Sequence, residues 1–508
     1  MRNKAALLAV LMPLTVAAEQ PLSAIDWLKD PEMAEYSGPV LLEPPVSTSG
    51  REPEVRVSPL GSSIQPVGLV PPSSTGLPPD LWTGSDVMKL TRWIATAPVR
   101  DFTAMQRLLF TLLLTESNPP AAAKDAERLL LARLDRLIDL GAVDAARELV
   151  QSVGADKSAA RFARWFDTSL LTGDEDKSCA VLTEKPALAP GLPARIFCAA
   201  RGNDWQTAAL ILETARALEL LPNAQLDLLD WFLHPDLFED AAPMPVPRDP
   251  DPLTFRLFET IGERLPTSDL PRAFATADLR DVAGWKAQIE AAERLARIGA
   301  LSPNQLLGLY TERQPAASGG VWTRVAAVQS FEAALNEGDD KAIANSLPLV
   351  WDAMRDIRLE VPFATLFAER LAQQDLTDPK AQMLAWRIQL LGPAYEEASH
   401  KPPYKTPETA FLAAVAQGTA GGIAAPGTMA QAIADGFARG EAPPDDLRRA
   451  LDRGQLGEVI LRTIVLFNTG AHGNPDAITG ALATLRTVNL EDTARRAALQ
   501  LMLLERVP

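Results

Sequence analysis

The chain has very few of the residues that most often carry enzyme chemistry. Its 508 residues include only two cysteines, three histidines and four tyrosines. The histidines, His234, His400 and His472, lie far apart, and no HExxH motif occurs. A protein metal site needs His, Cys or carboxylate ligands at a regular spacing. We therefore predict that the chain holds neither a metal ion nor a cofactor.

Motifs of nucleophilic and phosphate chemistry are also missing. The sequence has no GxSxG elbow, no SxxK pair and no P-loop. The glycine-rich run 418–422 lacks the Gly-Lys-Ser/Thr ending, and we expect it to join two helices. The acidic clusters 173–176 and 336–340 lack the alternating ligands of a calcium loop. Helix N-termini, which favour acidic residues, account for both clusters.

Basic charge and long apolar runs are scarce as well. The chain has 65 acidic and 49 basic residues, for a formal net charge of −16. Nucleic acids and anionic membrane surfaces attract Lys and Arg, so an acidic chain does not suit them. After the first twenty residues, no stretch has the roughly 20 apolar residues that a membrane-spanning helix needs. We expect a protein or peptide partner, with no nucleic acid and no membrane span.

The first 18 residues have the layout of a secretory signal peptide. Arg2 and Lys4 precede an apolar run from Ala5 to Val16, and small residues follow up to Ala18. This order of a positive, an apolar and a small-residue region is typical of a cleaved signal. We predict cleavage after Ala18 and a soluble periplasmic protein. The alternative is an ordinary buried N-terminal helix.

The two cysteines are predicted to form a disulfide bond. Export exposes thiols to an oxidising compartment, and Cys179 and Cys198 are the only cysteines. The bond would close a loop of about 20 residues and stabilise the fold by about 3 kcal/mol in the chain-entropy model. The alternative is a pair of reduced, buried thiols.

Residues 19–80 form a segment rich in Pro, Ser and Gly. Ten prolines lie between Pro39 and Pro79. Since proline lacks a backbone donor and clashes inside a helix, we expect no helix there. The segment is predicted to be a tether or an extended chain on the surface of the body. Within it, Glu54–Ser58 and Ile64–Val70 have the residues of short strands.

From residue 85 onward the pattern predicts one helix after another. Apolar residues recur at i, i+3, i+4 and i+7, as they do on one face of a helix. Leu130, Leu134 and Leu137 follow this spacing up to Gly141, and a new helix is predicted from Val143. A glycine C-cap followed at once by a helix start predicts two antiparallel neighbours.

The same unit recurs with turns at Gly202, Gly299, Gly338 and Gly454. Pro348 is expected to kink or split the second helix of the Gly338 unit. Helix pairs that each present one apolar face must stack to bury it. The sequence therefore predicts an all-α fold.

The Gly141 unit resembles tetratricopeptide-like α-helical repeats. Leu137, Gly141, Ala146 and Val150 stand near the apolar, Gly, Ala and aromatic positions of that superfamily. Ala208, Leu212 and Ala215 of the Gly202 unit match less closely, and the family's aromatic and Pro landmarks are mostly missing. The resemblance implies an α-solenoid of stacked antiparallel helix pairs. A non-repetitive helix bundle is the alternative.

Proline-rich breaks divide the predicted array. We expect one half over residues 81–236, a linker over 237–252 and a second half over 253–508. Weaker breaks are expected at 395–407 and 418–427. The final predicted helix, 491–506, is expected to cap the array.

The function predicted from these patterns is that of a non-enzymatic scaffold or adaptor for a cell-envelope protein. Two alternatives stay open: an assembly chaperone for an envelope machine, and a helical enzyme acting on polysaccharide or peptidoglycan. Helical polysaccharide lyases use Tyr, His and Arg in a groove. Four residues are the groove candidates for such an enzyme: Arg387, Tyr395, His400 and Tyr404.

Overall fold

The computed structural model describes residues 65–120, 122–239, 241–315 and 317–504. These residues form α-helices joined mainly by short turns, which confirms the all-α prediction. Their only β pairing consists of two isolated bridges, Val67 with Ser117 and Val70 with Thr115. The bridges lie at the predicted strand Ile64–Val70. The predicted signal peptide and the predicted strand Glu54–Ser58 lie outside the described residues.

The α-helices of the described residues follow one another along the chain. The first group is α1 Pro72–Thr75, α2 Val87–Thr96, α3 Thr103–Leu114, α4 Ala123–Asp139, α5 Val143–Ser152, α6 Ala159–Thr172, α7 Glu175–Glu184, α8 Leu192–Arg201, α9 Trp205–Ala217 and α10 Asn223–Leu233. The second is α11 Pro252–Thr260, α12 Ala275–Asp278, α13 Trp285–Ala296, α14 Pro303–Thr311, α15 Val321–Glu337, α16 Asp340–Asp356, α17 Glu360–Ala372 and α18 Pro379–Leu391. The third is α19 Tyr395–Ser399, α20 Pro407–Gln417, α21 Thr428–Gly436, α22 Asp445–Asp452, α23 Leu456–Ala471, α24 Pro475–Thr487 and α25 Glu491–Leu503.

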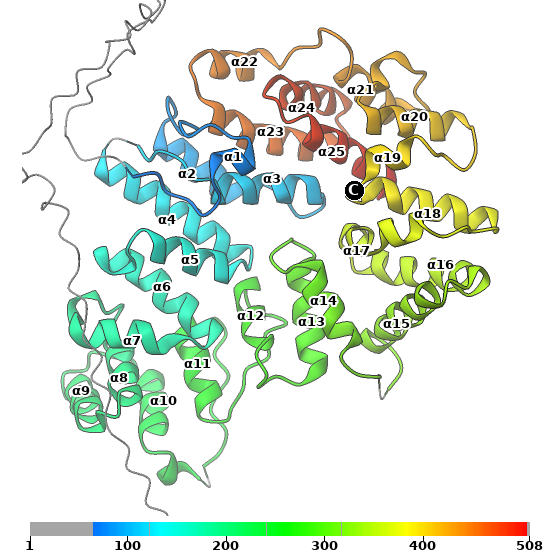
Figure 1. The fold of residues 1–508 in the computed structure, drawn as a ribbon. Coiled ribbons are helices and arrows are strands. Elements are labelled where there is room, and N and C mark those ends of the chain that lie inside the picture. Colours follow the sequence, from blue (N-terminus) through cyan, green and yellow to red (C-terminus); the bar gives the residue numbers. More distant parts are fainter. Residues whose placement is uncertain (1–64, 121, 240, 316, 505–508) are drawn as a thin grey trace, which may run out of the picture. The chain divides into compact units, whose positions relative to one another are not determined.

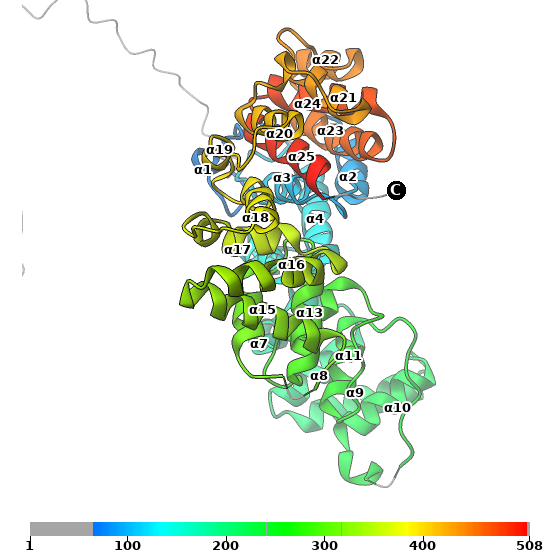
Figure 2. The ribbon, with the colours of Figure 1, turned by 90° about the vertical axis from the view of Figure 1, so that its right-hand side faces the viewer.

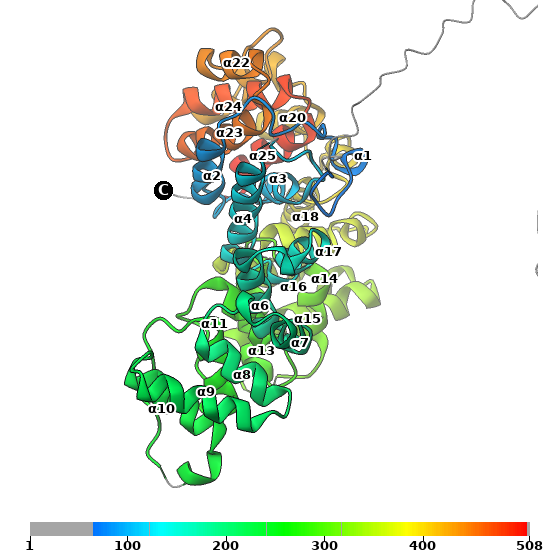
Figure 3. The same ribbon diagram turned by 90° about the vertical axis from the view of Figure 1, so that its left-hand side faces the viewer.

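The helical body follows a path that closes on itself. Helices that are neighbours in sequence pack side by side from α4 to α10 and again from α12 to α18 (Figure 1). The last helices then return to the first, because α23 contacts α2, and α25 contacts α3. Figures 2 and 3 show α8–α10 at one end of the body and α20–α24 at the other. Helix α25, expected to cap the array, instead packs against α3, α18, α20 and α24.

Most of the predicted turns are present with the expected backbone. Gly141, Gly299, Gly338 and Gly454 all have positive φ, between 67° and 82°, which favours glycine. The turn after α8 differs. Gly202 has a φ of −78°, and the left-handed residue is Asn203, with a φ of 61°. Asparagine tolerates this conformation better than most residues.

The local expectations about proline hold only in part. Helix α16 runs through Pro348 as one helix, so it is not split there. The expected break at 395–407 contains α19, a helix of five residues, while the residues from His400 to Thr406 form no helix. The proline-rich segment contains α1, a single turn with Pro72 at its first position. A proline fits there because the first turn needs no backbone donor from it.

The predicted disulfide is confirmed. The sulfur atoms of Cys179 on α7 and Cys198 on α8 lie 1.98 Å apart, and both side chains are buried. The bond joins two consecutive antiparallel helices. It therefore closes the loop of the predicted length, with a sequence separation of 19.

Arg133 of α4 holds the start of the described chain against the body. Its guanidinium is buried and donates to three backbone oxygens: those of Leu113 at 2.8 Å, Val67 at 3.0 Å and Thr115 at 3.0 Å. Burial lowers the pKa of Arg133 to about 10. Leu77 and Leu81 are also buried, so this end of the proline-rich segment lies on the body.

The segment 237–252 begins within the 3₁₀ turn Pro235–Phe238, and its described residues form no α-helix before Pro252, the first residue of α11. Helices on its two sides are nevertheless in contact. Fully buried Glu175 of α7 accepts from Arg256 of α11, at 3.1 Å from Nε and 2.9 Å from Nη2. Residues 63–508 form one compact unit.

No helix in the described ranges combines the length and the apolar character needed to cross a membrane.

Candidate functional site

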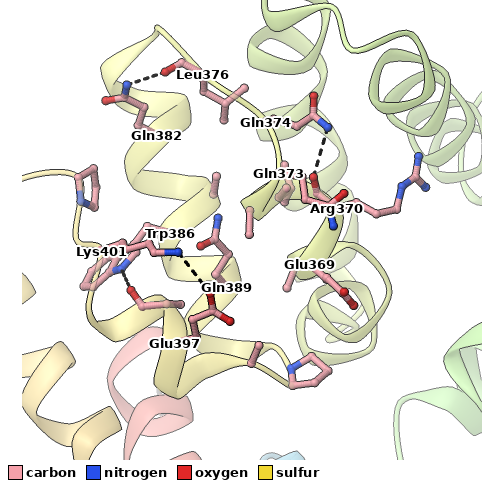
Figure 4. A pocket seen from close by; sticks show the side chains of 18 of the residues that line it. Glu369, Arg370, Gln373, Gln374, Leu376, Gln382, Trp386, Gln389, Glu397 and Lys401 are labelled. Atoms are coloured by element: carbon pink, nitrogen blue, oxygen red, sulfur yellow. Dashed lines mark hydrogen bonds and ion pairs between the residues drawn. The ribbon is translucent and has the colours of Figure 1, made fainter.

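A cavity of about 750 Å³ lies beside α17, α18 and α19 (Figure 4). Its volume is within the range of pockets that bind small ligands or short peptide segments. Leu371, Ala385 and Trp386 are buried residues of its lining and give it an apolar floor. The rim carries polar and charged side chains from the end of α17, the turn after it, and α19.

A glycine at the end of α18 allows the two long helices to approach closely. A Cβ atom added to Gly392 would lie 2.5 Å from the Cβ of Ala368 on α17. Contacts this short do not occur between real side chains, so any larger residue would push α18 away. Arg496 of α25 donates to the backbone oxygens of Gly392, at 3.2 Å, and Pro393, at 3.3 Å. Helix α25 therefore fixes the position of the connection between α18 and α19.

Hydrogen bonds hold two side chains of the cavity in place. The indole Nε1 of Trp386 donates to the backbone oxygen of Ala398 at 2.9 Å, which joins α18 to α19. The Gln382 amide donates to the oxygen of Leu376 at 2.6 Å and accepts from the Tyr404 hydroxyl at 2.7 Å. These two residues form a rigid part of the wall.

Two other amides of the lining are free to bind a ligand. The side chains of Gln373 and Gln389 make no hydrogen bond with any residue that the structure describes. Gln389 comes from α18 and Gln373 from the turn after α17, so they lie on different walls (Figure 4). Each amide offers one acceptor and two donors. Together they can bind a group that has both donors and acceptors, such as a peptide backbone.

Most of the charge at the rim is engaged in pairs. Arg370 points away from α18 in Figure 4 and donates to Asn336 of α15 at 2.7 Å. Lys401 pairs with Glu397 at 3.2 Å. Glu369 has no ion pair within the described part of the chain. Asp375, which also lines the cavity, has no ion pair there either, so the rim carries two unpaired carboxylates.

This site was not predicted from the sequence, although a signal for it is present. Gln382, Trp386 and Gln389 are spaced i, i+4 and i+7, which places them on one face of a helix. A face that carries two amides around a tryptophan is unusual for a core. No pattern in the sequence, however, placed this face opposite the end of α17.

The four groove candidates have separate surroundings, and none of them lines the 750 Å³ cavity. Arg387 pairs with Glu408 at 2.6 Å and lines a smaller cavity of about 170 Å³. The ring Nδ1 of exposed His400 lies 3.4 Å from the amide nitrogen of Gln417. Tyr404 reaches the cavity only through its bond to Gln382.

Tyr395 is buried and faces α25. Its hydroxyl donates to Asp492 at 2.9 Å, and the Arg496 guanidinium lies 4.5 Å from its ring centre. Burial raises the pKa of Tyr395, and the negative charge of Asp492 raises it further. A tyrosine that acts as a base needs the opposite shift. Its surroundings suit a structural contact between α19 and α25.

The potential metal ligands among the described residues are dispersed. No three of their His, Cys, Asp and Glu side chains are grouped so that they could hold a metal ion. His472 lies 3.9 Å from Asp101 through Nε2, and its Nδ1 is 2.7 Å from the backbone oxygen of Asn468. The histidines are therefore at separate places in the fold.

Comparison of the chain with protein-family models, with curated proteins and with solved structures finds no match.

Proposed function

We propose that this protein is an exported, non-enzymatic scaffold or adaptor that binds an extended segment of a cell-envelope protein in the cavity beside α17–α19. The observation that carries the proposal is the pair of unbonded amides, Gln373 and Gln389, above an apolar floor. Backbone groups of an extended peptide would bind the amides, and its side chains would cover Leu371 and Trp386. Recognition of an extended segment in this way combines backbone hydrogen bonds with side-chain pockets.

The helix packing supports the proposal that the body is an α-solenoid in two runs, α4–α10 and α12–α18. Within each run, every helix packs against the next one along the chain. Solenoids bind partners through surfaces built from successive repeats. The cavity lies at the end of the second run, where α17 and α18 meet α19.

Export is part of the proposal and has its own test. The signal-peptide pattern at residues 1–18 and the disulfide between Cys179 and Cys198 both support a periplasmic location. Mass spectrometry of the protein from cells should give a chain that begins at Glu19. An intact N-terminus and reduced cysteines would contradict export.

Photocrosslinking at the cavity tests the binding function. A benzophenone amino acid is placed at Gln373 or Gln389, and a third variant carries it at Leu210 of α9, which is 69% exposed. We expect both cavity positions to crosslink the same envelope protein, and position 210 not to do so. Crosslinks to that protein from all three positions, or from neither cavity position, would contradict the proposal.

A further inference from the structure

The charges that line the cavity beside α17–α19 do not balance. The charged lining residues are Glu369, Arg370, Asp375, Glu397 and Lys401. Lys401 is already paired with Glu397. Arg370 is turned to α15, where it donates to Asn336 and lies 3.9 Å from Glu332. Both positive charges of the lining therefore have partners, and two of its negative charges are left over.

The two remaining carboxylates, Glu369 and Asp375, lie on either side of the free amide Gln373 in the sequence. Glu369 is one helical turn before Gln373, so the two side chains share one face at the end of α17 (Figure 4). Asp375 follows in the turn after the helix. Neither carboxylate bonds to a side chain in the described part of the chain, and both are exposed. A ligand in the cavity can therefore reach them.

The backbone at this end of α17 is a further source of negative potential. The last carbonyl groups of a helix have no partner within it, and the helix dipole places about half a negative charge there. A basic side chain in the last turn ordinarily offsets this charge. In α17 the only basic residue of the last turn is Arg370, which is turned to α15. The helix end and the two carboxylates therefore favour a cation at the same place.

We propose that the segment bound in this cavity carries a lysine or an arginine, whose cation pairs with Glu369 and Asp375 at the end of α17. The backbone of that segment is the one that Gln373 and Gln389 bind, so the inference rests on the proposed function. A neutral side chain at this place would leave both carboxylates unpaired, and an acidic one would add a third negative charge. Charge complementarity therefore selects a basic segment.

Three pools of blocked peptides test this preference. Each pool holds heptapeptides, N-acetylated and C-terminally amidated, with outer positions mixed from Ala, Val and Leu and a central Lys, Gln or Glu. Saturation-transfer NMR measures their binding to the full chain at physiological ionic strength, where distant charges are screened. We expect the Lys pool to bind about tenfold more tightly than the Gln pool, and the Glu pool to bind most weakly. Equal binding of the Lys and Gln pools would overturn only this inference, whereas no binding of any pool would overturn the proposed function as well.

Two double variants locate the cation. Glu369→Gln with Asp375→Asn should lower the affinity for the Lys pool to that for the Gln pool. Asp249→Asn with Asp281→Asn changes the net charge equally at two exposed carboxylates outside the cavity, and it should keep the preference for Lys. Equal melting temperatures of the two variants establish that both are folded. A preference that survives in the first variant, or is lost in both, would overturn the assignment. Blocked lysine alone, bound as tightly as the Lys pool, would also overturn it, because the site would then bind a free cation.

Discussion

Asp167 of α6 is a carboxyl whose surroundings favour its neutral form. Burial raises its pKa to about 7, and the nearby charges of Asp251 and Asp135 act in the same direction, while Arg164 opposes them. Its ordinary value is 3.8. A raised pKa in the folded state stabilises the fold below the unfolded value, and this stability is lost as the pH rises toward 7. Above pH 7 the folded protein carries a charge in an unfavourable place.

Replacement of this carboxyl should therefore stabilise the protein only at higher pH. Asp167→Asn is neutral at every pH, so we expect the free energy of unfolding to rise by about 1–3 kcal/mol at pH 8 and to change little near pH 4. Urea unfolding at pH 4, 6 and 8 measures this free energy for the wild type and the variant. Asp281→Asn, at an exposed carboxylate, is the control and should show no such dependence. An equal gain at all three pH values would exclude titration of Asp167 as the cause.

Removal of the disulfide tests how much this one bond stabilises the fold. Cys179→Ala with Cys198→Ala removes the bond while keeping small apolar groups in the core. We expect the free energy of unfolding to fall by about 2–4 kcal/mol, since the unfolded chain gains freedom over a loop of about 20 residues. Denaturation of the wild type with and without a reductant provides the comparison. An unchanged midpoint in both comparisons would show that the bond contributes nothing to stability.

Single residues differ in how far the sequence predicts them. The bond between Cys179 and Cys198 was predictable because the predicted export favours a disulfide and two cysteines leave one pairing. The shift of Asp167 was not, because it depends on burial and on Asp251, which is 84 residues further along the chain. The bound amide of Gln382 and the free amide of Gln389 likewise look alike in the sequence.

At the scale of elements, the contact of α17 with α18 determines the candidate site. Gly392→Ala would place a Cβ atom 2.5 Å from Ala368, so the two helices must separate. We expect the free energy of unfolding to fall by about 1–3 kcal/mol. The crosslinks from Gln373 and Gln389 should weaken as well, because the two walls move apart.

Gly308→Ala is the matched control for this change. Gly308 lies within α14, and an added Cβ would meet no atom within 4 Å. Alanine favours a helix over glycine, so this variant should be more stable by about 0.5–1 kcal/mol. If the free energy of unfolding shifts in the same direction in both variants, the close approach at Gly392 does not contribute to stability.

Local sequence patterns, namely apolar periodicity and glycine at helix ends, predict the helix pairs and their turns well. Gly141 and Gly338 end their helices in the left-handed conformation, because glycine adopts it without strain. The same logic failed at Gly202, where Asn203 takes that role. The tendency of proline to end a helix was given too much influence in the prediction. Pro348 lies within one helix, and its side chain is exposed.

At the scale of the whole molecule, α3 near the start of the described chain and α25 near its end hold each other. The backbone N–H of Ala104 on α3 donates to Oε1 of Gln500 on α25 at 2.9 Å, and Gln500 is buried. These residues are 396 positions apart. Hydrophobic periodicity specifies which face of α25 is buried, but it does not identify the helix that covers it. For this reason the sequence predicts a capping helix and does not predict a closed path.

Gln500→Ala tests this closure. It leaves the N–H of Ala104 without its partner, so we expect a loss of about 1–3 kcal/mol. Amide hydrogen exchange should become faster in both α3 and α25. Gln431→Ala removes an exposed amide that bonds only to Asp435 of its own helix region, and it should change neither quantity. Faster exchange confined to α25 would argue against a coupled contact.

Binding of an extended polypeptide by the free amides of the cavity beside α17–α19 is tested most directly by a dissociation constant. Titration calorimetry determines it for a synthetic peptide that spans the crosslinked segment. We expect Gln373→Ala with Gln389→Ala to raise the dissociation constant about tenfold or more, and Gln431→Ala to leave it unchanged. An unchanged dissociation constant for the double variant, in a folded protein, would contradict binding through these amides.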